Sequence, residues 1–596
     1  MASIDFENGT VIPASWLNDV NDVVYGNTQI PASQVEFQPD GGDARSVQSK
    51  LRDTVSVKDF GAVGDGIVDD TTAIKDATAY IQSIGGGTLY FPQGTYRTYS
   101  DASTDPLGDF SSLDGVGIVY DGADLVVDRT FSGSETIYMF VFSACKNIKL
   151  SNTNVSCTQT QPVGQKTSRG AYLYRFLQGC ENISADNTYA DSLRAVWDFH
   201  REPADPASYA SKLIDIGRTT AVDCGYPLLG SLSGNNLRAQ LSTLRCGRSY
   251  FFTGASDHVV HLRSTNHEAS VDCLLATDAG QGMQNVDLKY VNLDSTTNDL
   301  SINCVRVEYQ DGQTYAGTFK NIKVDFNIQT TVGVTALGFA FGISKTANDL
   351  PDPTDRGHVL DGVTLTGNIN NPSGRGIAML YIGTWGAGEF VRNIKIDNLR
   401  CFSGAVVNMN LSSLKDVATI QNFTSNTAVE TTGNAVGKIT YINADVNGAT
   451  TASTADTSLI DYHSCNIRSA TNQSRINKAF FNTYIGTELV TTFRGTYNVQ
   501  APLATSAVIS LTPPGNSADV AGILDVVDSN GDIARFALNG SSHTTQEVND
   551  PSSKYSTTAG AVSINVYWSA GNGRYEIQNG TASGNSVRLC VTYFAA

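Results

Sequence analysis

Charged side chains and long apolar runs are both scarce in this sequence of 596 residues. Asp, Glu, Lys and Arg together make up 16% of it, whereas about a quarter is usual for a globular protein. No run approaches the roughly 18 apolar residues that a membrane-spanning helix needs, so membrane insertion is not expected. The opening MASIDFENG lacks the basic and apolar regions of a secretory signal, so export by that route is not expected either.

Basic residues are particularly few. The chain has 40 Lys and Arg against 58 Asp and Glu, which gives a formal net charge of −18. Binding to nucleic acid depends on Lys and Arg that neutralise phosphates, so this balance argues against a nucleic-acid partner. An acidic, polar surface is compatible with neutral or sugar-like ligands.

Closely spaced cysteine pairs are absent, although the chain has 10 Cys residues. Cys157, Cys180, Cys224 and Cys246 follow one another at intervals of 23, 44 and 22 residues. A recurrence near 22 predicts that a small apolar residue returns to one buried position of a structural repeat. We therefore expect reduced thiols, no metal site and no cofactor.

The segment VKDFGAVGDGIVDDTTAIKDATAYI (57–81) predicts a capping element. Its Gly-Asp turns precede a helix pattern for which Asp69 or Asp70 is the expected N-cap, and the GGG at 85–87 should end that helix. A helix that lies across the end of a stack of strands shields the open edge of the stack. The expected apolar face of the helix consists of Ala73, Ile74, Ala77, Ile81 and Ile84.

Behind this segment a short pattern recurs, in which a turn residue is followed by alternating apolar residues. Each copy is too small to bury its own apolar face, so neighbouring copies must stack. Short strands that recur every ~22–36 residues without long helices predict a parallel β-helix, with about 14–18 coils between residues 56 and 480. The clearest copies are KNIKLSNTNV (146–155), ENISADNTYA (181–190), QNVDLKYVNL (284–293), KNIKVDFNIQ (320–329) and RNIKIDNLRC (392–401).

The predicted organisation has three parts. Residues 1–55 form an N-terminal segment and linker, in which Leu17, Val20 and Val24 give one heptad's worth of apolar seam. So short a seam is stable only if several copies of the chain bundle together, which predicts a homo-oligomer. Residues 56–495 form the solenoid, and residues 496–596 read as strands joined by turns, which predicts a C-terminal β-sandwich.

The sequence VKDFGAVGDGIVDDTTAIKDA followed by GGGTLYFPQGTY resembles the N-terminal signature of the pectate-lyase-like superfamily. The resemblance implies a right-handed parallel β-helix, but that superfamily includes hydrolases, lyases and binding proteins. Residues 1–25 resemble the virion-anchoring segments of tailspikes from short-tailed bacteriophages. Together these features resemble a tailspike depolymerase. That class implies a homotrimer in the virion tail, attached to a phage tail or adaptor protein through residues 1–25, that binds and cleaves a bacterial capsular polysaccharide or exopolysaccharide.

Three functions are compatible with this resemblance. Glycoside hydrolysis needs two carboxylates, and stacked coils bring acids at matching positions ~4.8 Å apart. A lyase needs a base and a group that neutralises a uronate carboxylate, and a receptor-binding spike needs no catalysis. We favour hydrolysis, with β-elimination and binding without catalysis as the alternatives.

The stretch VWDFHREP (196–203) is the richest in candidate site residues. At a period of two, Asp198, His200 and Glu202 share one face of a strand, while Trp197 and Arg201 lie on the other. The acids are candidates for catalysis, His200 for substrate binding, Trp197 for stacking on a sugar and Arg201 for an acidic sugar. The alternative interpretation is a turn with a surface ion pair and a buried Trp.

Further candidates lie downstream. The His-rich stretch 256–273 contributes Glu268 and Asp272 as acids, and its three His are expected to be turn residues because their spacing fits no standard zinc site. Glu308 lies where a strand ends, with an Asp-Gly turn as the simpler explanation. Trp385 on a Gly-rich loop is a candidate sugar platform. The leading acid–base candidates are Glu202, Glu268 and Asp272, followed by Asp198 and Glu308.

Overall fold

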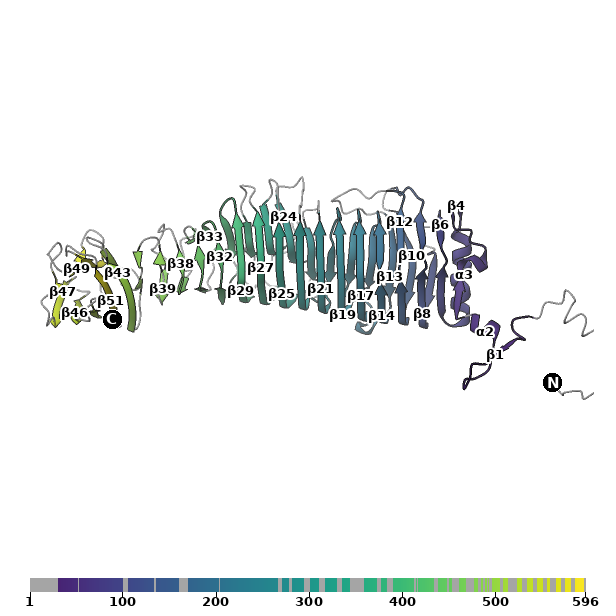
Figure 1. The fold of residues 1–596 in the computed structure, drawn as a ribbon, viewed down its shortest axis with the longest axis horizontal. Helices are drawn as coiled ribbons and strands as arrows, with labels where there is room; N and C mark the ends of the chain where they lie inside the picture. The colour runs from purple at the N-terminus through teal and green to yellow at the C-terminus, as the bar shows by residue number, and fades with distance from the viewer. Residues whose placement is uncertain are drawn as a thin grey trace, which may run out of the picture.

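A long stack of parallel strands forms the body of the protein (Figure 1). In the computed structural model the described residues are 31–51, 53–99, 106–132, 135–159, 170–202, 204–265, 271–277, 281–293, 301–309, 317–329, 335–343, 359–371, 377–382, 390–411, 414, 416–432, 438–447, 450–452, 460–467, 476–480, 484–485, 488–489, 491–492, 496–503, 508–512, 522–527, 533–539, 544–549, 555–557, 564–569, 574–579 and 585–593. The N-terminal seam at residues 17–24 lies outside these ranges.

The first described segments lead into the predicted cap. They are β1 (Glu36–Phe37), β2 (Arg45–Ser46), α2 (Val47–Leu51), β3 (Thr54–Ser56), a 3-10 turn (Val57–Phe60), β4 (Asp65–Asp69) and α3 (Thr71–Ile84). Helix α3 lies across the end of the stack (Figure 1) and buries the face predicted for it, with Ile84 only partly covered. Gly85 ends α3 in the left-handed conformation at φ 84°, as the GGG predicts.

The two aspartates before α3 make different hydrogen bonds in the cap. Asp70 is the N-cap by position, but its buried carboxylate makes no capping bond and instead accepts hydrogen bonds from the backbone N–H groups of Val63 and Arg97, at 2.7 and 3.3 Å. Asp69 accepts a bond from the backbone N–H of Thr71 at 2.9 Å. The Gly-Asp turns are therefore tied to the first coil by Asp70.

One strand of each coil belongs to a 13-stranded parallel sheet. Its outer face carries the candidate site described below. Its strands are β7 (Gly108–Ser111), β10 (Thr136–Ser143), β13 (Gly170–Leu177), β16 (Ala195–His200), β18 (Tyr226–Ser231), β20 (Tyr250–Thr253), β22 (Val271–Thr277), β24 (Ser301–Tyr309), β26 (Thr335–Ile343), β28 (Ile377–Ile382), β30 (Val407–Leu411), β33 (Val429–Thr432) and β36 (Thr450–Ala452).

A 26-stranded sheet forms the other wall. Its central coils contribute one long strand each: β17 (Lys212–Val222), β19 (Asn235–Leu244), β21 (Ser256–Thr265), β23 (Gln284–Leu293), β25 (Thr318–Gln329), β27 (Val359–Asn371) and β29 (Phe390–Ser403). The outer coils contribute shorter strands, which are β3 and β4 from the cap region together with β5 (Gly87–Phe91), β6 (Gly94–Thr98), β8 (Asp114–Tyr120), β9 (Ala123–Val127), β11 (Lys146–Ser151), β12 (Asn154–Cys157), β14 (Glu181–Asp186), β15 (Thr188–Asp191), β31 (Val417–Gln421), β32 (Thr424–Ser425), β34 (Lys438–Ile442), β35 (Asp445–Val446), β37 (Ile460–His463), β38 (Asn466–Ile467), β39 (Ile476–Phe480), β40 (Tyr484–Ile485) and β41 (Glu488–Leu489). The all-β, parallel-stacked prediction is confirmed.

Asparagines explain the recurring sequence pattern. Asn182, the second residue of β14, has a φ of 57°, a left-handed conformation that Asn tolerates better than most residues. Its side-chain amide donates to the side-chain oxygen of Asn147 on the preceding coil at 2.5 Å, and Asn321 donates to Asn285 in the same way at 2.9 Å. Each copy of the pattern therefore links its turn to the turn before it.

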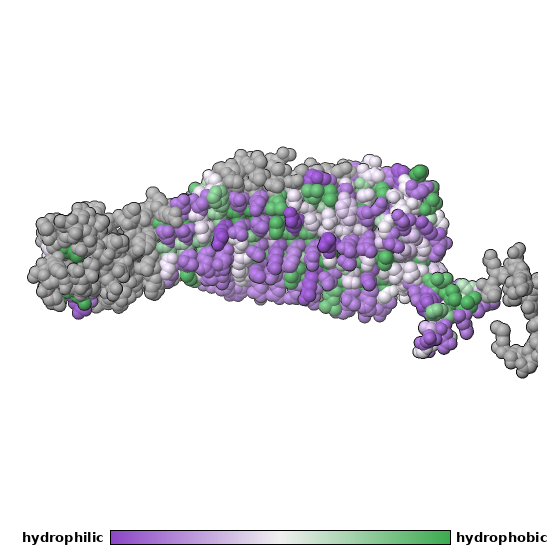
Figure 2. All heavy atoms as spheres, viewed as in Figure 1, coloured by the Kyte–Doolittle hydropathy of each residue, from purple (hydrophilic) through white to green (hydrophobic). Residues whose placement is uncertain are grey.

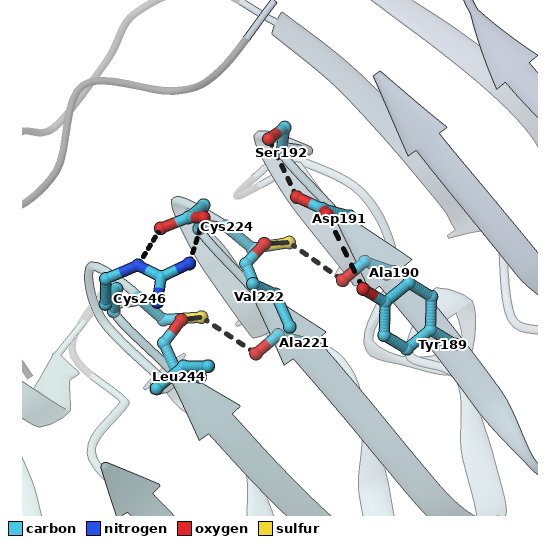
Figure 3. A network of polar contacts seen from close by, with 11 residues as sticks. Tyr189, Ala190, Asp191, Ser192, Ala221, Val222, Cys224, Leu244 and Cys246 are labelled. Carbon is cyan, nitrogen blue, oxygen red and sulfur yellow. Dashed lines mark hydrogen bonds and ion pairs between the residues drawn. The ribbon is translucent and has the colours of Figure 1, made fainter. Parts of the chain in front are cut away.

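Aromatic rings and cysteines fill the interior between the sheets. Tyr174 stacks on Trp197 of the next coil with ring centroids 5.1 Å apart. The thiol of Cys224 donates to the Ala190 carbonyl at 3.7 Å, and the thiol of Cys246 to the Ala221 carbonyl at 3.3 Å (Figure 3). Free, buried thiols are confirmed for nine of the ten cysteines, all except Cys590. Outside, the solenoid is mainly hydrophilic in the view of Figure 2.

Beyond the last coils, two five-stranded sheets replace the parallel stack. Most of their pairings are antiparallel, and Figure 1 places them at the end of the rod opposite α3. One contains β42 (Thr491–Thr492), β44 (Val508–Thr512), β50 (Arg574–Asn579), β49 (Ile564–Ser569) and β48 (Tyr555–Ser556); the other contains β43 (Thr496–Leu503), β51 (Asn585–Tyr593), β45 (Gly522–Val527), β46 (Ile533–Asn539) and β47 (Thr544–Asn549).

Candidate functional site

Strand β16 separates the residues of VWDFHREP as a period of two predicts. Trp197 and Phe199 face the interior and join the aromatic stack. Asp198 and His200 are placed on the outer face of the 13-stranded sheet, where Asp198 is in register with Arg175 of β13 and Leu229 of β18. The strand ends at His200, so Glu202 lies on the connection that follows.

Arginines and tyrosines of neighbouring coils interleave beside Asp198. We call this set the arginine–tyrosine cluster: Tyr138, Tyr172, Arg175, Arg194 and Tyr226. The guanidinium of Arg175 lies 4.3 Å from the ring centroid of Tyr138, and that of Arg194 lies 5.2 Å and 5.9 Å from those of Tyr172 and Tyr226. The Nε–H of Arg194 also donates to the Tyr172 hydroxyl at 2.5 Å. Contacts of this kind hold cations in fixed positions on a largely desolvated surface.

Asp198 lies at the base of this cluster and is 3% exposed. Its Oδ2 is 3.3 Å from Nε of Arg175. Burial raises the pKa of Asp198, although Arg175, His200 and Arg194 oppose that shift. Burial, with a contribution from Asp198, also raises the pKa of Tyr172 to about 12. A carboxyl group whose pKa is raised in this way can retain a proton and donate it.

Glu202 has the opposite environment. It is exposed, and its Oε1 lies 2.8 Å from Nε2 of His200. This hydrogen bond lowers the pKa of Glu202. His200 interacts electrostatically with Asp198 on one side and contacts Glu202 on the other. Two carboxyl groups with pKa values shifted in opposite directions thus both interact with one imidazole, an arrangement that suits an acid–base pair.

Two predicted site residues are instead part of the core. Trp197 is fully buried and its indole N–H donates to the hydroxyl of Thr219 at 3.2 Å. The prediction that it stacks on a sugar is therefore wrong, because the sheet faces the ring inward. Asp272 is also fully buried, and its Oδ2 accepts a bond from the Tyr290 hydroxyl at 2.7 Å. A carboxylate enclosed there cannot reach a polysaccharide, so the predicted catalytic role of Asp272 is wrong.

Arg201 has a mixed position. It is 4% exposed and donates to the carbonyls of Leu232 and Asp205 at 2.9 and 2.7 Å, which fixes the connection after β16. It also lines a polar cavity of about 410 Å³ with Asn235 and Gln284. Its role toward an acidic sugar stays a prediction.

The remaining predicted residues stay untested. Glu308 lies in β24, in register with Ala276, and its side chain is not described. Glu268 and Trp385 lie outside the described residues. The expectation that the histidines of 256–273 are turn residues is wrong for His258, which faces inward from β21, and for His261, which lies on the outer face of the same strand.

The sequence did not point to the arginine–tyrosine cluster. Tyr172 and Arg175 belong to RGAYLYRFL (169–177), a stretch that signals a strand but not its register. Arg194 comes from the turn before β16. The signal that was available is the unusual density of Arg and Tyr at outward positions of consecutive coils.

Within the described ranges no group of His, Cys, Asp and Glu has the arrangement of a metal site. Among the same residues, no helix combines the length and apolar character that crossing a membrane requires.

Comparison with known proteins finds a family match near the N-terminal end. Residues 54–171 match the family described as rhamnogalacturonase A/epimerase, pectate lyase-like. A stretch of 54 residues is 57% identical to plasmin and fibronectin-binding protein A of Streptococcus pneumoniae, and covers 9% of this chain and 8% of that protein. A stretch of 80 residues is 40% identical to mannuronan C5-epimerase AlgE4 of Azotobacter vinelandii, covering 13% and 14%. This chain thus spans only a small part of these curated relatives.

Solved structures are similar along a greater length at low identity. The A-module of mannuronan C5-epimerase AlgE6 of Azotobacter vinelandii is 12% identical, with a TM-score of 0.38, over 69% of this chain and 98% of the module. The tailspike protein of Escherichia coli bacteriophage HK620, solved with a pentasaccharide, is 12% identical with a TM-score of 0.36, over 98% of this chain and 100% of the tailspike chain.

Proposed function

We propose that the protein binds a bacterial surface polysaccharide on the outer face of the 13-stranded sheet and cleaves it by glycoside hydrolysis. One observation carries the proposal. Asp198 is buried and has a raised pKa, whereas Glu202 is exposed and has a lowered pKa, and both contact or interact with His200. Environments that shift the pKa values of two carboxyl groups in opposite directions are typical of acid–base catalysis.

In this mechanism Asp198 supplies the proton. The carboxylic acid protonates the glycosidic oxygen as the bond to the anomeric carbon breaks, and Glu202 takes a proton from the water that attacks that carbon. Arg175 then stabilises the carboxylate left on Asp198, from 3.3 Å. Because Asp198 is 3% exposed, sugar binding requires the side chains that cover it to rotate, a movement that side chains make readily.

A second candidate is β-elimination on a uronate. The observation that favours it is the bond from Arg194 to the Tyr172 hydroxyl, since arginine can neutralise a uronate carboxylate while tyrosine acts as the base. Against it, the pKa of Tyr172 is raised to about 12. A phenol that holds its proton so firmly is a poor base, so hydrolysis is the better assignment.

The wider assignment is a phage tailspike. It is supported by the order of an N-terminal segment, a capped parallel solenoid and two C-terminal sheets, and by the match to a pectate-lyase-like family. We propose a homotrimer in the virion tail, joined to a tail or adaptor protein through residues 1–25. Sedimentation at the mass of one chain would contradict the trimer.

The test of the function is a screen of capsular polysaccharides and exopolysaccharides from different bacteria. Hydrolysis predicts new reducing ends without ultraviolet absorbance from an unsaturated uronate. Reducing ends accompanied by that absorbance would establish β-elimination instead. Binding to the polysaccharide without new reducing ends would mean that the protein is a receptor-binding spike.

A further inference from the structure

A groove with an excess of basic side chains crosses the outer face of the 26-stranded sheet. It has a volume of about 520 Å³ and lies over β17, β19, β21 and β23. The candidate site above is on the other sheet, so the two surfaces are distinct although neighbouring coils supply them. We call this surface the basic groove, and its lining residues used below are Arg218, Gln240, Ser242, His261, Arg263 and Lys289.

Strand register fixes how these side chains follow one another. Arg218 is in register with Gln240, Gln240 with His261 and His261 with Lys289. Coils are spaced by ~4.8 Å, so Arg218 and Lys289 stand ~14 Å apart along the stack. Arg263 is two residues beyond His261 on β21, on the same face and ~7 Å away along the strand. All four basic side chains are exposed.

The groove differs from the rest of this sheet face in how its cations are compensated. Elsewhere on it, several basic residues pair with a carboxylate of an adjoining coil. Three such pairs, with their N–O distances, are Lys212–Glu181 at 3.7 Å, Arg245–Asp223 at 2.7 Å and Lys323–Asp287 at 3.1 Å.

Within the described part of the chain, Arg218, Arg263 and Lys289 form no ion pair. Asp325 is in register with Lys289, but its Oδ1 accepts a bond from the Thr366 hydroxyl at 3.1 Å. Like charges gathered without carboxylate partners repel one another, so the groove is suited to a negatively charged ligand.

The uncharged residues that line the groove indicate which kind of negatively charged ligand it could bind. Gln240 and Ser242 lie between the cations and offer donors and acceptors to hydroxyl groups. The lining contains no Phe, Tyr or Trp ring on which a base could stack. A ligand that offers carboxylates to the cations and hydroxyl groups to Gln240 and Ser242 would fit this lining. An acidic polysaccharide has both kinds of group, so it fits better than a nucleic acid.

We infer that the basic groove is a second, non-catalytic binding site for an acidic polysaccharide. The inference rests on the proposed function in taking a polysaccharide as the ligand. It goes beyond that function in two respects. It specifies that the polysaccharide is negatively charged, and it assigns binding in the basic groove to a different surface from the candidate site where cleavage occurs.

The test measures binding of the full-length protein to polygalacturonate, with dextran of similar length as the uncharged probe. Arg263→Gln combined with Lys289→Gln should weaken polygalacturonate binding at least ~10-fold, because two charge-assisted contacts are lost. Raising the salt concentration should weaken wild-type binding more than binding by the double variant. Lys149→Gln is the matched control, since Lys149 is an exposed lysine on the same sheet outside the groove, and it should bind as wild type does.

Several results would overturn the inference. They are no wild-type binding to polygalacturonate, equal binding to dextran, equal or tighter binding to a single-stranded oligonucleotide, or unchanged binding by the double variant. Asp198→Asn separates the two proposals, because it should lower cleavage ~10²–10⁴-fold and leave polygalacturonate binding intact. If cleavage fails in every screen while the double variant still loses binding, the groove stands and the proposed enzyme does not.

Discussion

Oδ2 of Asp198 lies 3.3 Å from Nε of Arg175 on the preceding coil, in a position almost closed to solvent. The Arg175 Nε–H is buried and makes no hydrogen bond, so the contact is an ion pair without the alignment of a hydrogen bond. Burial therefore outweighs the nearby guanidinium, and the pKa of Asp198 is raised rather than lowered. This balance makes an acid of a residue that an arginine would otherwise hold as a carboxylate.

The His200–Glu202 contact predicts a specific pH effect. His200→Gln removes the hydrogen bond that lowers the pKa of Glu202. Since the base must be deprotonated to act, the acidic limb of the kcat/KM profile should move to higher pH. The basic limb should move the same way, because His200 also lowers the pKa of Asp198, the general acid. A profile that only falls in height, with neither limb displaced, would show that His200 does not act through Glu202.

Trp197 should matter for stability and not for turnover. Trp197→Ala should lower the free energy of unfolding by about 3–5 kcal/mol, because it empties a fully buried site. Trp197→Phe keeps an aromatic ring in the stack and should have a smaller effect. Denaturant unfolding and activity per folded molecule measure the two properties. Weakened polysaccharide binding by a stably folded Trp197→Phe would restore its role as a sugar platform.

His258 should make stability depend on pH. It is fully buried, where its Nδ1 lies 2.7 Å from the Tyr250 hydroxyl, and burial lowers its pKa to about 4. Between pH 6.5 and about 4 the unfolded chain binds a proton that the folded chain does not, so stability falls as the pH falls through that window, by roughly 3 kcal/mol. Unfolding midpoints measured from pH 7 to pH 4 should flatten in His258→Asn. The exposed His261→Asn should retain the slope.

The thiols should be unreactive in the native protein. Burial raises the pKa of Cys157 to about 11 and that of Cys180 to about 12, and the thiolate is the reactive form. A thiol reagent at neutral pH should therefore label few of the ten cysteines until denaturant is added, when all ten should react. Rapid labelling of most of them under native conditions would contradict this packing.

The fold could be predicted because its signals are local. The spacing around Asn147 and Asn182 reflects a turn that adopts a left-handed conformation in successive coils, and a 22-residue recurrence of Cys224 and Cys246 reflects one buried position. Both signals can be recognised in the sequence without knowing which coils are neighbours in the fold. The cap followed from the same kind of reasoning, although Asp69 rather than Asp70 makes the capping bond.

The site was predictable only where one strand contained it. Alternation within β16 separates Asp198 from Trp197, but which of the two faces outward depends on the sheet, and the sequence left both as candidates. The partners Arg175 and Arg194 come from other segments of the chain, so their approach depends on coil register. Insertions at the turns change the length of each coil, so the register between neighbouring coils cannot be predicted from the sequence.

The central claim is that Asp198 is the general acid of a polysaccharide hydrolase. Its most direct test is the release of reducing ends by Asp198→Asn, with binding measured on the same polysaccharide. The control is Asp215→Asn, which changes an exposed carboxylate on the outer face of the other sheet. The account predicts that Asp198→Asn loses ~10²–10⁴-fold in turnover while folding and binding are kept, and that the control is unaffected. Near-normal turnover by a folded Asp198→Asn would contradict the account.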